Sequence, residues 1–136
     1  MKGIVEEILD QFRQGEEYLL EKNLNERTVS HKFAEYLQRR FPGWDVDVEY
    51  NKNKDGIKRM RLKGKLCRVF PDIIIHRRGS QDNLLIIEIK KNASESLRNK
   101  EIDRINKFKR QIGYSYGLFI NFKTGKNFGI IEMRWI

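Results

Sequence analysis

The sequence predicts an α/β (α+β) domain in which a mixed central β-sheet is flanked by helices, with an extra helix at the N-terminus. Two short apolar runs, at 70–76 and 84–91, are rich in strand-forming residues. Both runs are continuous rather than alternating, which is typical of a sheet that is covered on both faces. Three longer segments, at 2–22, 23–41 and 92–112, carry apolar residues at helical spacing and supply the covering helices.

Length and composition place the chain in a broad class. Its 136 residues predict a single domain, 1–136. Lys and Arg number 28 against 19 Asp and Glu, so the net charge is +9 and the expected partner is a polyanion, nucleic acid before an anionic membrane. One cysteine and two histidines make a poor zinc site.

The same composition predicts where the protein works. The chain has no apolar segment long enough to cross a bilayer, so we expect no membrane partner. Its N-terminus turns acidic too early for a signal peptide. The lone Cys67 has no partner for an internal disulfide and fits a reducing compartment. We therefore expect a cytoplasmic protein.

The ends of two helices are marked in the sequence. The helix at 2–22 is expected to kink or break at Gly15, after which the apolar face resumes. The helix at 92–112 begins at Asn92-Ala93-Ser94-Glu95, which resembles a capping box, and it ends at Gly113. Both are predicted to pack against the sheet.

Three further segments are predicted to be strands. The segment at 44–50 alternates apolar and acidic residues, so it is interpreted as a half-buried strand whose acidic row faces solvent. Glu49 in that row is an additional, weaker choice for a site acid. The segments at 114–122 and 127–136 are strands joined by a hairpin loop.

The segment at 57–66 is rich in Lys and Arg. Strand alternation places Arg59, Arg61 and Lys63 on one side and Lys58 on the other. We expect these four residues to bind nucleic-acid phosphates. The alternative is a charged surface hairpin that only keeps the protein soluble.

Each apolar run of the predicted sheet carries an acidic residue at one end. Asp72 opens the first run, and Glu88 shares a strand face with Lys90, about 6.6 Å further along the second. Pairing of the runs across the turn at 77–83 brings Asp72 close to Glu88 and Lys90. Two carboxylates repel unless a cation lies between them, and Mg²⁺ commonly binds one or two protein carboxylates. Lys90 can hold a phosphate oxygen or orient an attacking water.

At these positions the sequence resembles a known signature. Pro71-Asp72, then 15 residues, then Glu88-Ile89-Lys90 is similar to the motif of the PD-(D/E)xK nuclease superfamily. The resemblance implies a restriction-endonuclease-like core at 25–136, preceded by a helical extension at 1–22. It also implies Mg²⁺, with Mn²⁺ as a substitute, held by Asp72, Glu88 and the carbonyl of Ile89, with Lys90 in a catalytic role. The alternative is a surface Asp after a turn and a Glu/Lys pair at a strand end.

The resemblance also assigns a third acid. The superfamily often carries one on the first core helix, which here is the helix at 23–41. Its apolar stripe places Glu26 on the buried side and Glu35 towards solvent, so Glu26 is the matching residue. The start of this helix, Asn25-Glu26-Arg27, also resembles that of archaeal Holliday-junction resolvases. The alternative is that Glu26 only favours the helix N-terminus or closes a capping box from Asn23.

These observations predict a Mg²⁺-dependent nuclease that cuts DNA, with homodimerisation left open. No helix-turn-helix or zinc finger accompanies the core, so a structure-specific or accessory enzyme is expected rather than a sequence-specific restriction enzyme. Two alternatives stay open. One is a catalytically inactive nucleic-acid-binding module on the same fold, and the other is a basic protein that binds an acidic protein partner.

Overall fold

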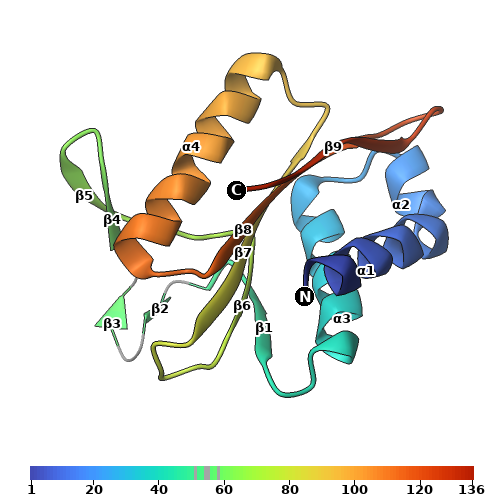
Figure 1. Ribbon diagram of the computed structural model, residues 1–136. Helices are drawn as coiled ribbons and strands as arrows, with labels where there is room; N and C mark the ends of the chain where they lie inside the picture. The colour runs from blue at the N-terminus through green and yellow to red at the C-terminus, as the bar shows by residue number, and fades with distance from the viewer. Residues whose placement is uncertain (51, 54–55, 58) are drawn as a thin grey trace.

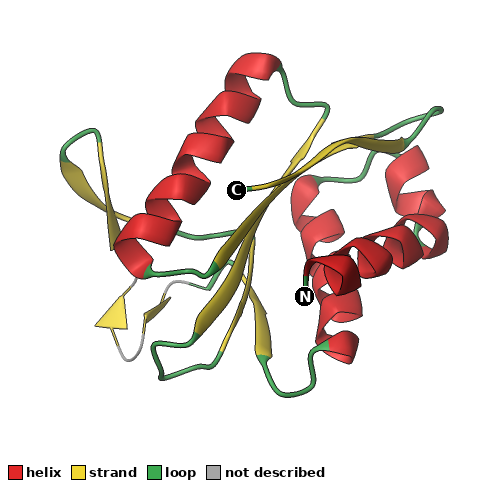
Figure 2. Ribbon diagram, viewed as in Figure 1, coloured by secondary structure: helices red, strands yellow, loops and turns green. Residues whose placement is uncertain are grey.

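The chain folds into three layers, with helices on both faces of a central sheet (Figures 1 and 2). The computed structural model describes residues 1–50, 52–53, 56–57 and 59–136. The helices are α1 (Lys2–Gly15), α2 (Glu17–Glu21), α3 (Glu26–Arg40) and α4 (Glu95–Ile112). The strands are β1 (Asp45–Val48), β2 (Lys52–Asn53), β3 (Gly56–Ile57), β4 (Arg59–Leu62), β5 (Lys65–Arg68), β6 (Ile73–His76), β7 (Asn83–Lys91), β8 (Tyr116–Lys123) and β9 (Gly129–Trp135).

The central sheet is mixed and has the strand order β1-β6-β7-β8-β9. The two apolar runs pair antiparallel as β6 and β7, with Ile73 opposite Ile87 and Ile75 opposite Leu85. Strands β7 and β8 are parallel, so the chain has to cross the sheet between them, and α4 makes this connection. Strand β9 pairs antiparallel with β8 at one edge. The predicted mixed sheet flanked by helices is confirmed.

The helix ends are set by local chemistry. The first predicted helix does break at Gly15, where a side chain would collide with the hydroxyl of Tyr36. Helix α3 is capped by Asn25, whose side chain accepts a hydrogen bond from the N–H of Thr28 at 2.9 Å. Helix α4 is capped by Ser94, not by Asn92 as the capping-box interpretation had it. Asn92 instead has a φ of 51° and binds the Thr124 side chain.

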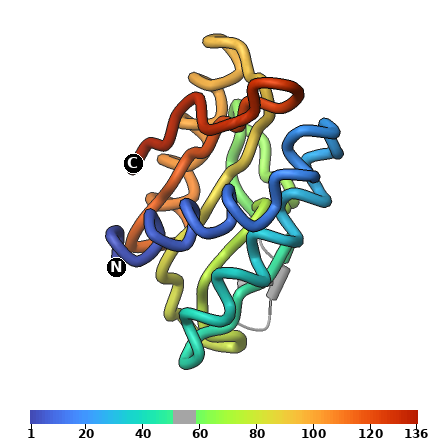
Figure 3. The backbone as a smooth tube through the Cα atoms, turned by 90° about the vertical axis from the view of Figure 1, so that its right-hand side faces the viewer, coloured from blue at the N-terminus to red at the C-terminus, as the bar shows by residue number. Residues whose placement is uncertain are grey.

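Apolar side chains fill the space on both sides of the sheet. On the face covered by α1–α3, the ring of Phe12 lies 5.3 Å from that of Phe33 and 5.9 Å from that of Phe122. Figure 3 shows α1 and α3 lying across this face. On the other face, Ile105 and Phe108 of α4 pack on the sheet. Among the described residues, no helix is both long and apolar enough to cross a membrane.

One acidic residue of β1 contradicts the prediction that the whole row faces solvent. The side chain of Asp47 is only 13% exposed. It lies 2.7 Å from Nε2 of His76 and accepts a hydrogen bond from Nε of Arg78 at 2.9 Å. Burial raises the pKa of Asp47, but the hydrogen bonds from Arg78 and His76 outweigh it and lower the pKa overall. Sequence alternation alone did not reveal these partners, because they come from the neighbouring strand and the turn after it.

Candidate functional site

Asp72 and Glu88 are brought together by the pairing of β6 with β7. The register sets Ile73 opposite Ile87, and continuing it by one residue sets Asp72 opposite Glu88. Opposite side chains in antiparallel strands share a face, with Cβ atoms about 4.5–5.5 Å apart. Alternation puts the Glu88 carboxyl group on the face that holds Ile86, which is the face covered by α4, whereas the Asp72 carboxylate lies at the strand edge, beside the N–H of Ile89.

The main chain of Ile89 lies beside this pair because the hydrogen-bond ladder between β6 and β7 ends at Ile73 and Ile87. The N–H of Ile89 donates to Oδ2 of Asp72 at 2.8 Å, so a side chain replaces the strand neighbour. In the same register the residue opposite Ile89 is Pro71, which has no N–H to donate to the Ile89 carbonyl. The N–H and C=O of one strand residue point to the same edge. The Ile89 carbonyl is therefore directed towards Asp72 without a ladder partner.

Glu88 is a carboxyl group that folding has removed from water. The residue is 3% exposed, and its Oε1 atom has no hydrogen-bond partner among the described residues. Burial and the negative charge of Asp72 raise the pKa of Glu88 well above its ordinary value. The positive charge of Arg104 opposes this shift only in part. Positive charge placed beside Glu88 would therefore favour its ionised form.

Helix α4 adds two charged residues that the sequence analysis did not assign to the site. Nζ of Lys90 lies 3.9 Å from Oε1 of Glu101. Nε of Arg104 lies 4.0 Å from Oε1 of Glu88. Burial raises the pKa of Glu101, and the charges of Lys90 and Arg104 counter this only partly. The site thus contains three carboxyl groups and two cations in a poorly solvated space.

A signal for Glu101 was present in the sequence. Leu97, Glu101 and Ile105 follow one another at four-residue spacing, so Glu101 occupies a position in the apolar stripe of α4. An ionisable residue in such a stripe is buried, and a buried ionisable residue needs a partner. The identity of that partner, Lys90, depends on how α4 lies on the sheet.

Glu26 reaches the same sheet edge from the opposite face. It stands in the first turn of α3, and its Oε2 accepts a hydrogen bond from the N–H of Lys91 at 3.1 Å. The capping-box alternative for Glu26 is wrong, because Asn25 caps the helix and the Glu26 carboxylate binds β7. Glu26, Glu49 and Asp72 all line a pocket of about 170 Å³.

The remaining lining of this pocket explains the position of Glu49. Arg27 lies 3.1 Å from a carboxylate oxygen of Glu49, and Ser30 and Val48 complete the wall. Glu49 is exposed, as expected of the β1 row, and it also lines this open pocket, with a φ of 52°. Glu49 therefore shares this pocket with Asp72, whose carboxylate lies at the sheet edge between the pocket and Glu88.

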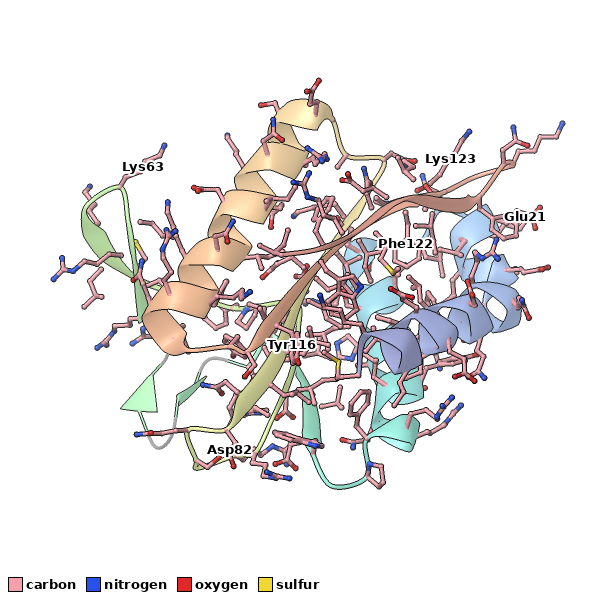
Figure 4. The ribbon with its side chains drawn as sticks, viewed as in Figure 1. Glu21, Lys63, Asp82, Tyr116, Phe122 and Lys123 are labelled. Carbon is pink, nitrogen blue, oxygen red and sulfur yellow. The ribbon has the colours of Figure 1, made fainter. Side chains whose placement is uncertain are left out.

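Three of the four basic residues predicted to bind phosphates lie on the β4–β5 hairpin, and Lys63 at its tip lines a pocket of about 320 Å³ with Glu101 and Arg104 of α4. Lys58 lies outside the described residues. Arg59 and Arg61 are exposed on β4, and Lys63 lies at the tip of the β4–β5 hairpin, beside α4 (Figures 1 and 4). Gln111 of α4 holds the hairpin through hydrogen bonds with the N–H and the C=O of Arg61.

The donor atoms at the sheet edge suit a hard cation. Within the described part of the chain, no three Asp, Glu, His or Cys side chains are gathered closely enough to hold one metal ion. The predicted ligand set needs only the carboxylates of Asp72 and Glu88 and the Ile89 carbonyl. The unpartnered Oε1 of Glu88 and the open carbonyl are oxygen donors of the kind that Mg²⁺ binds. These residues therefore fit a divalent cation.

Comparison with known proteins does not identify a relative of this chain. No protein-family model, curated protein or solved structure matches this chain. The function of the chain is therefore inferred from the residues at the sheet edge, which include the carboxyl pair of Asp72 and buried Glu88, the Ile89 carbonyl, and the ion pair of Lys90 with Glu101.

Proposed function

We propose that this chain is a metal-dependent nuclease of PD-(D/E)xK type that hydrolyses DNA phosphodiester bonds on a restriction-endonuclease-like core. The observation that carries the proposal is the pairing of Asp72 with buried Glu88 at the end of β6. The carbonyl of Ile89 is directed towards this pair, and Lys90, two residues along β7 from Glu88, extends its ammonium group to within 3.9 Å of Glu101. The net charge of +9 favours a polyanionic substrate.

Each residue has a distinct role in the proposed reaction. Asp72, Glu88 and the Ile89 carbonyl hold a divalent cation, Mg²⁺ or its substitute Mn²⁺. When bound, such an ion polarises a phosphoryl oxygen and lowers the pKa of water. Lys90 stabilises the charge that develops on the phosphate oxygens. Glu101 positions the Lys90 ammonium group, and Glu26 contributes a further carboxylate at the strand edge.

The test compares cleavage of supercoiled plasmid, linear duplex and flapped oligonucleotides in the presence of Mg²⁺ or Mn²⁺. We expect Asp72→Asn and Glu88→Gln to lower cleavage about 100-fold or more. Glu35→Gln is the matched control, because Glu35 is an exposed carboxylate of α3 that pairs only with Lys32 among the described residues. Equal cutting by wild type and Asp72→Asn, or no cutting of any substrate, would overturn the proposal.

A catalytically inactive nucleic-acid-binding module is the second candidate. It is favoured by the internal cations at the site, since Arg104 lies beside Glu88 and Lys90 lies beside Glu101. These ion pairs are a way to hold buried carboxyl groups without any metal. Calorimetry separates the two functions, because only the nuclease is expected to bind Mn²⁺ with an affinity that Asp72→Asn removes.

A further inference from the structure

The β4–β5 hairpin has one apolar face and one basic face. Met60 of β4 is fully buried against the core on the α4 side of the sheet. Strand alternation turns Arg59 and Arg61 the other way, and the register sets Arg59 opposite Arg68 of β5. Both arginines of that cross-strand pair are exposed. We call Arg59, Arg61, Leu66 and Arg68 the outer face of the hairpin.

Among the residues that the structure describes, the cations of this outer face have no acidic partners. Like charges directly opposite each other destabilise a strand pair. Among the described residues, no carboxylate forms an ion pair with any arginine of the outer face. Elsewhere on the surface Arg27, Arg78 and Arg98 each hold a carboxylate. A row of unpartnered guanidinium groups is suited to an external chain of phosphates.

An exposed aromatic ring lies between the hairpin and the candidate site. Phe70 is 51% exposed, whereas its neighbours Val69 and Pro71 are buried and fix the backbone. Phe70 follows Arg68 of the outer face and precedes Asp72 by two residues, so its backbone lies at most about 7 Å from that of Asp72. An aromatic ring in this setting offers a stacking surface to a nucleobase.

We propose that the outer face and Phe70 bind an unpaired strand of nucleic acid, with phosphates on Arg59, Arg61 and Arg68 and one base stacked on Phe70. In a duplex the bases are stacked on one another and covered, so a surface ring finds no free base face. The inference deepens the proposed function and rests on it for the cleavage step. It assigns unpaired segments, such as single strands and flaps, as the substrate class.

The test measures binding without catalysis, by fluorescence anisotropy in EDTA. Labelled oligo(dT), oligo(rU), an abasic phosphodiester oligomer of equal length and a duplex are the probes. We expect Phe70→Ala to weaken binding of oligo(dT) or oligo(rU) about 5- to 150-fold, the effect of one stacked base, and Phe70→Tyr to restore it. Binding of the abasic oligomer and of the duplex is expected to stay unchanged in Phe70→Ala.

Two controls isolate the ring and the charges. Tyr18→Ala removes an aromatic residue that is 67% exposed on α2, on the far side of the sheet (Figure 1), and is expected to bind as wild type. Arg59→Ala/Arg68→Ala is expected to weaken both oligo(dT) and the abasic oligomer and to reduce the salt slope by about 1.4. Arg39→Ala/Arg40→Ala has the same net charge and is expected to leave that slope unchanged.

The outcomes separate this inference from the proposed nuclease activity. Unchanged oligo(dT) binding by Phe70→Ala, an equal loss on the abasic oligomer, or equally tight binding of polyglutamate would overturn the single-strand surface. Any of these results leaves the cleavage test of Asp72→Asn unaffected. Base-dependent binding together with no cleavage in Mn²⁺ would support the surface and refute the nuclease. A preference between oligo(dT) and oligo(rU) identifies the sugar and supports the surface.

Discussion

Replacement of Glu88 by Gln tests whether this carboxyl group is buried in the protonated form. Glu88 is 3% exposed, and the pKa of its side chain is raised well above the ordinary 4.5 by burial and by Asp72. In the unfolded chain the same carboxyl group regains its ordinary pKa. Between these two pKa values the native state therefore holds one proton that the unfolded state has lost.

The sign and size of the effect follow from this single proton. The free energy of unfolding changes with pH in proportion to the protons bound in the unfolded state minus those bound in the native state. That difference is minus one for Glu88, so the wild type loses up to about 1.4 kcal/mol of stability per pH unit as the pH rises above 4.5. The amide of the Glu88→Gln variant cannot ionise, so we expect the stability of this variant to rise relative to wild type by up to about 2.7 kcal/mol from pH 5 to pH 7.

Urea unfolding followed by circular dichroism at pH 5, 6 and 7 measures this difference. The comparison is made with Glu88→Gln, with Glu35→Gln as an exposed control, and in EDTA so that no metal binds. Glu101 also has a raised pKa, caused mainly by burial, and its charge acts on Glu88, so the same comparison is repeated in a Glu101→Gln background. If the wild type and Glu88→Gln show parallel stability over this pH range, the carboxyl group is not buried as described.

Three further perturbations test the site and the core. Mn²⁺ is expected to raise the melting temperature of the wild-type protein, and to raise it more at pH 8 than at pH 6, because the metal competes with the proton on Glu88. Asp72→Asn should remove this increase in the same thermal scans. Lys90→Ala is expected to lower cleavage about 100-fold in a timed plasmid assay while Mn²⁺ affinity by calorimetry stays the same. Phe12→Ala is expected to cost about 3–5 kcal/mol of unfolding free energy in urea, because the ring is fully buried between Phe33 and Phe122.

Each of these expectations has a clear contrary result. A melting temperature that Mn²⁺ raises equally in wild type and Asp72→Asn would place the metal elsewhere. Loss of Mn²⁺ affinity in Lys90→Ala, in step with the loss of cleavage, would make Lys90 structural rather than catalytic. A cost below about 1 kcal/mol for Phe12→Ala would mean that α1 contributes little to the core.

Much of the fold follows from neighbours in the sequence. The continuous apolar runs identified β6 and β7, and Gly15 and Gly113 marked where helices end, because strand and helix periods and backbone freedom act over a few residues. The pairing of Asp72 with Glu88 also followed, since two adjacent strands with a short turn have a narrow choice of register.

The caps show the limit of local reasoning. The sequence suggested a capping box from Asn23 for α3 and another from Asn92 for α4. The structure uses Asn25 and Ser94, while Asn23 and Asn92 bind Thr124 in the loop after β8. A polar side chain near the start of a helix can bind either the helix N-terminus or a distant loop, and the local sequence does not specify which of the two it binds.

Sequence alone thus determined the strands of the central sheet, the helices, and the acid pair formed by Glu88 and by Asp72 just before β6. Only the tertiary structure decided that Glu101 and Arg104 of α4 lie against Lys90 and Glu88, and that Glu26 binds the β7 edge from the opposite face. The physical reason is that these contacts join residues from different layers. Their distances depend on how each helix packs on the sheet, which no spacing along the chain specifies.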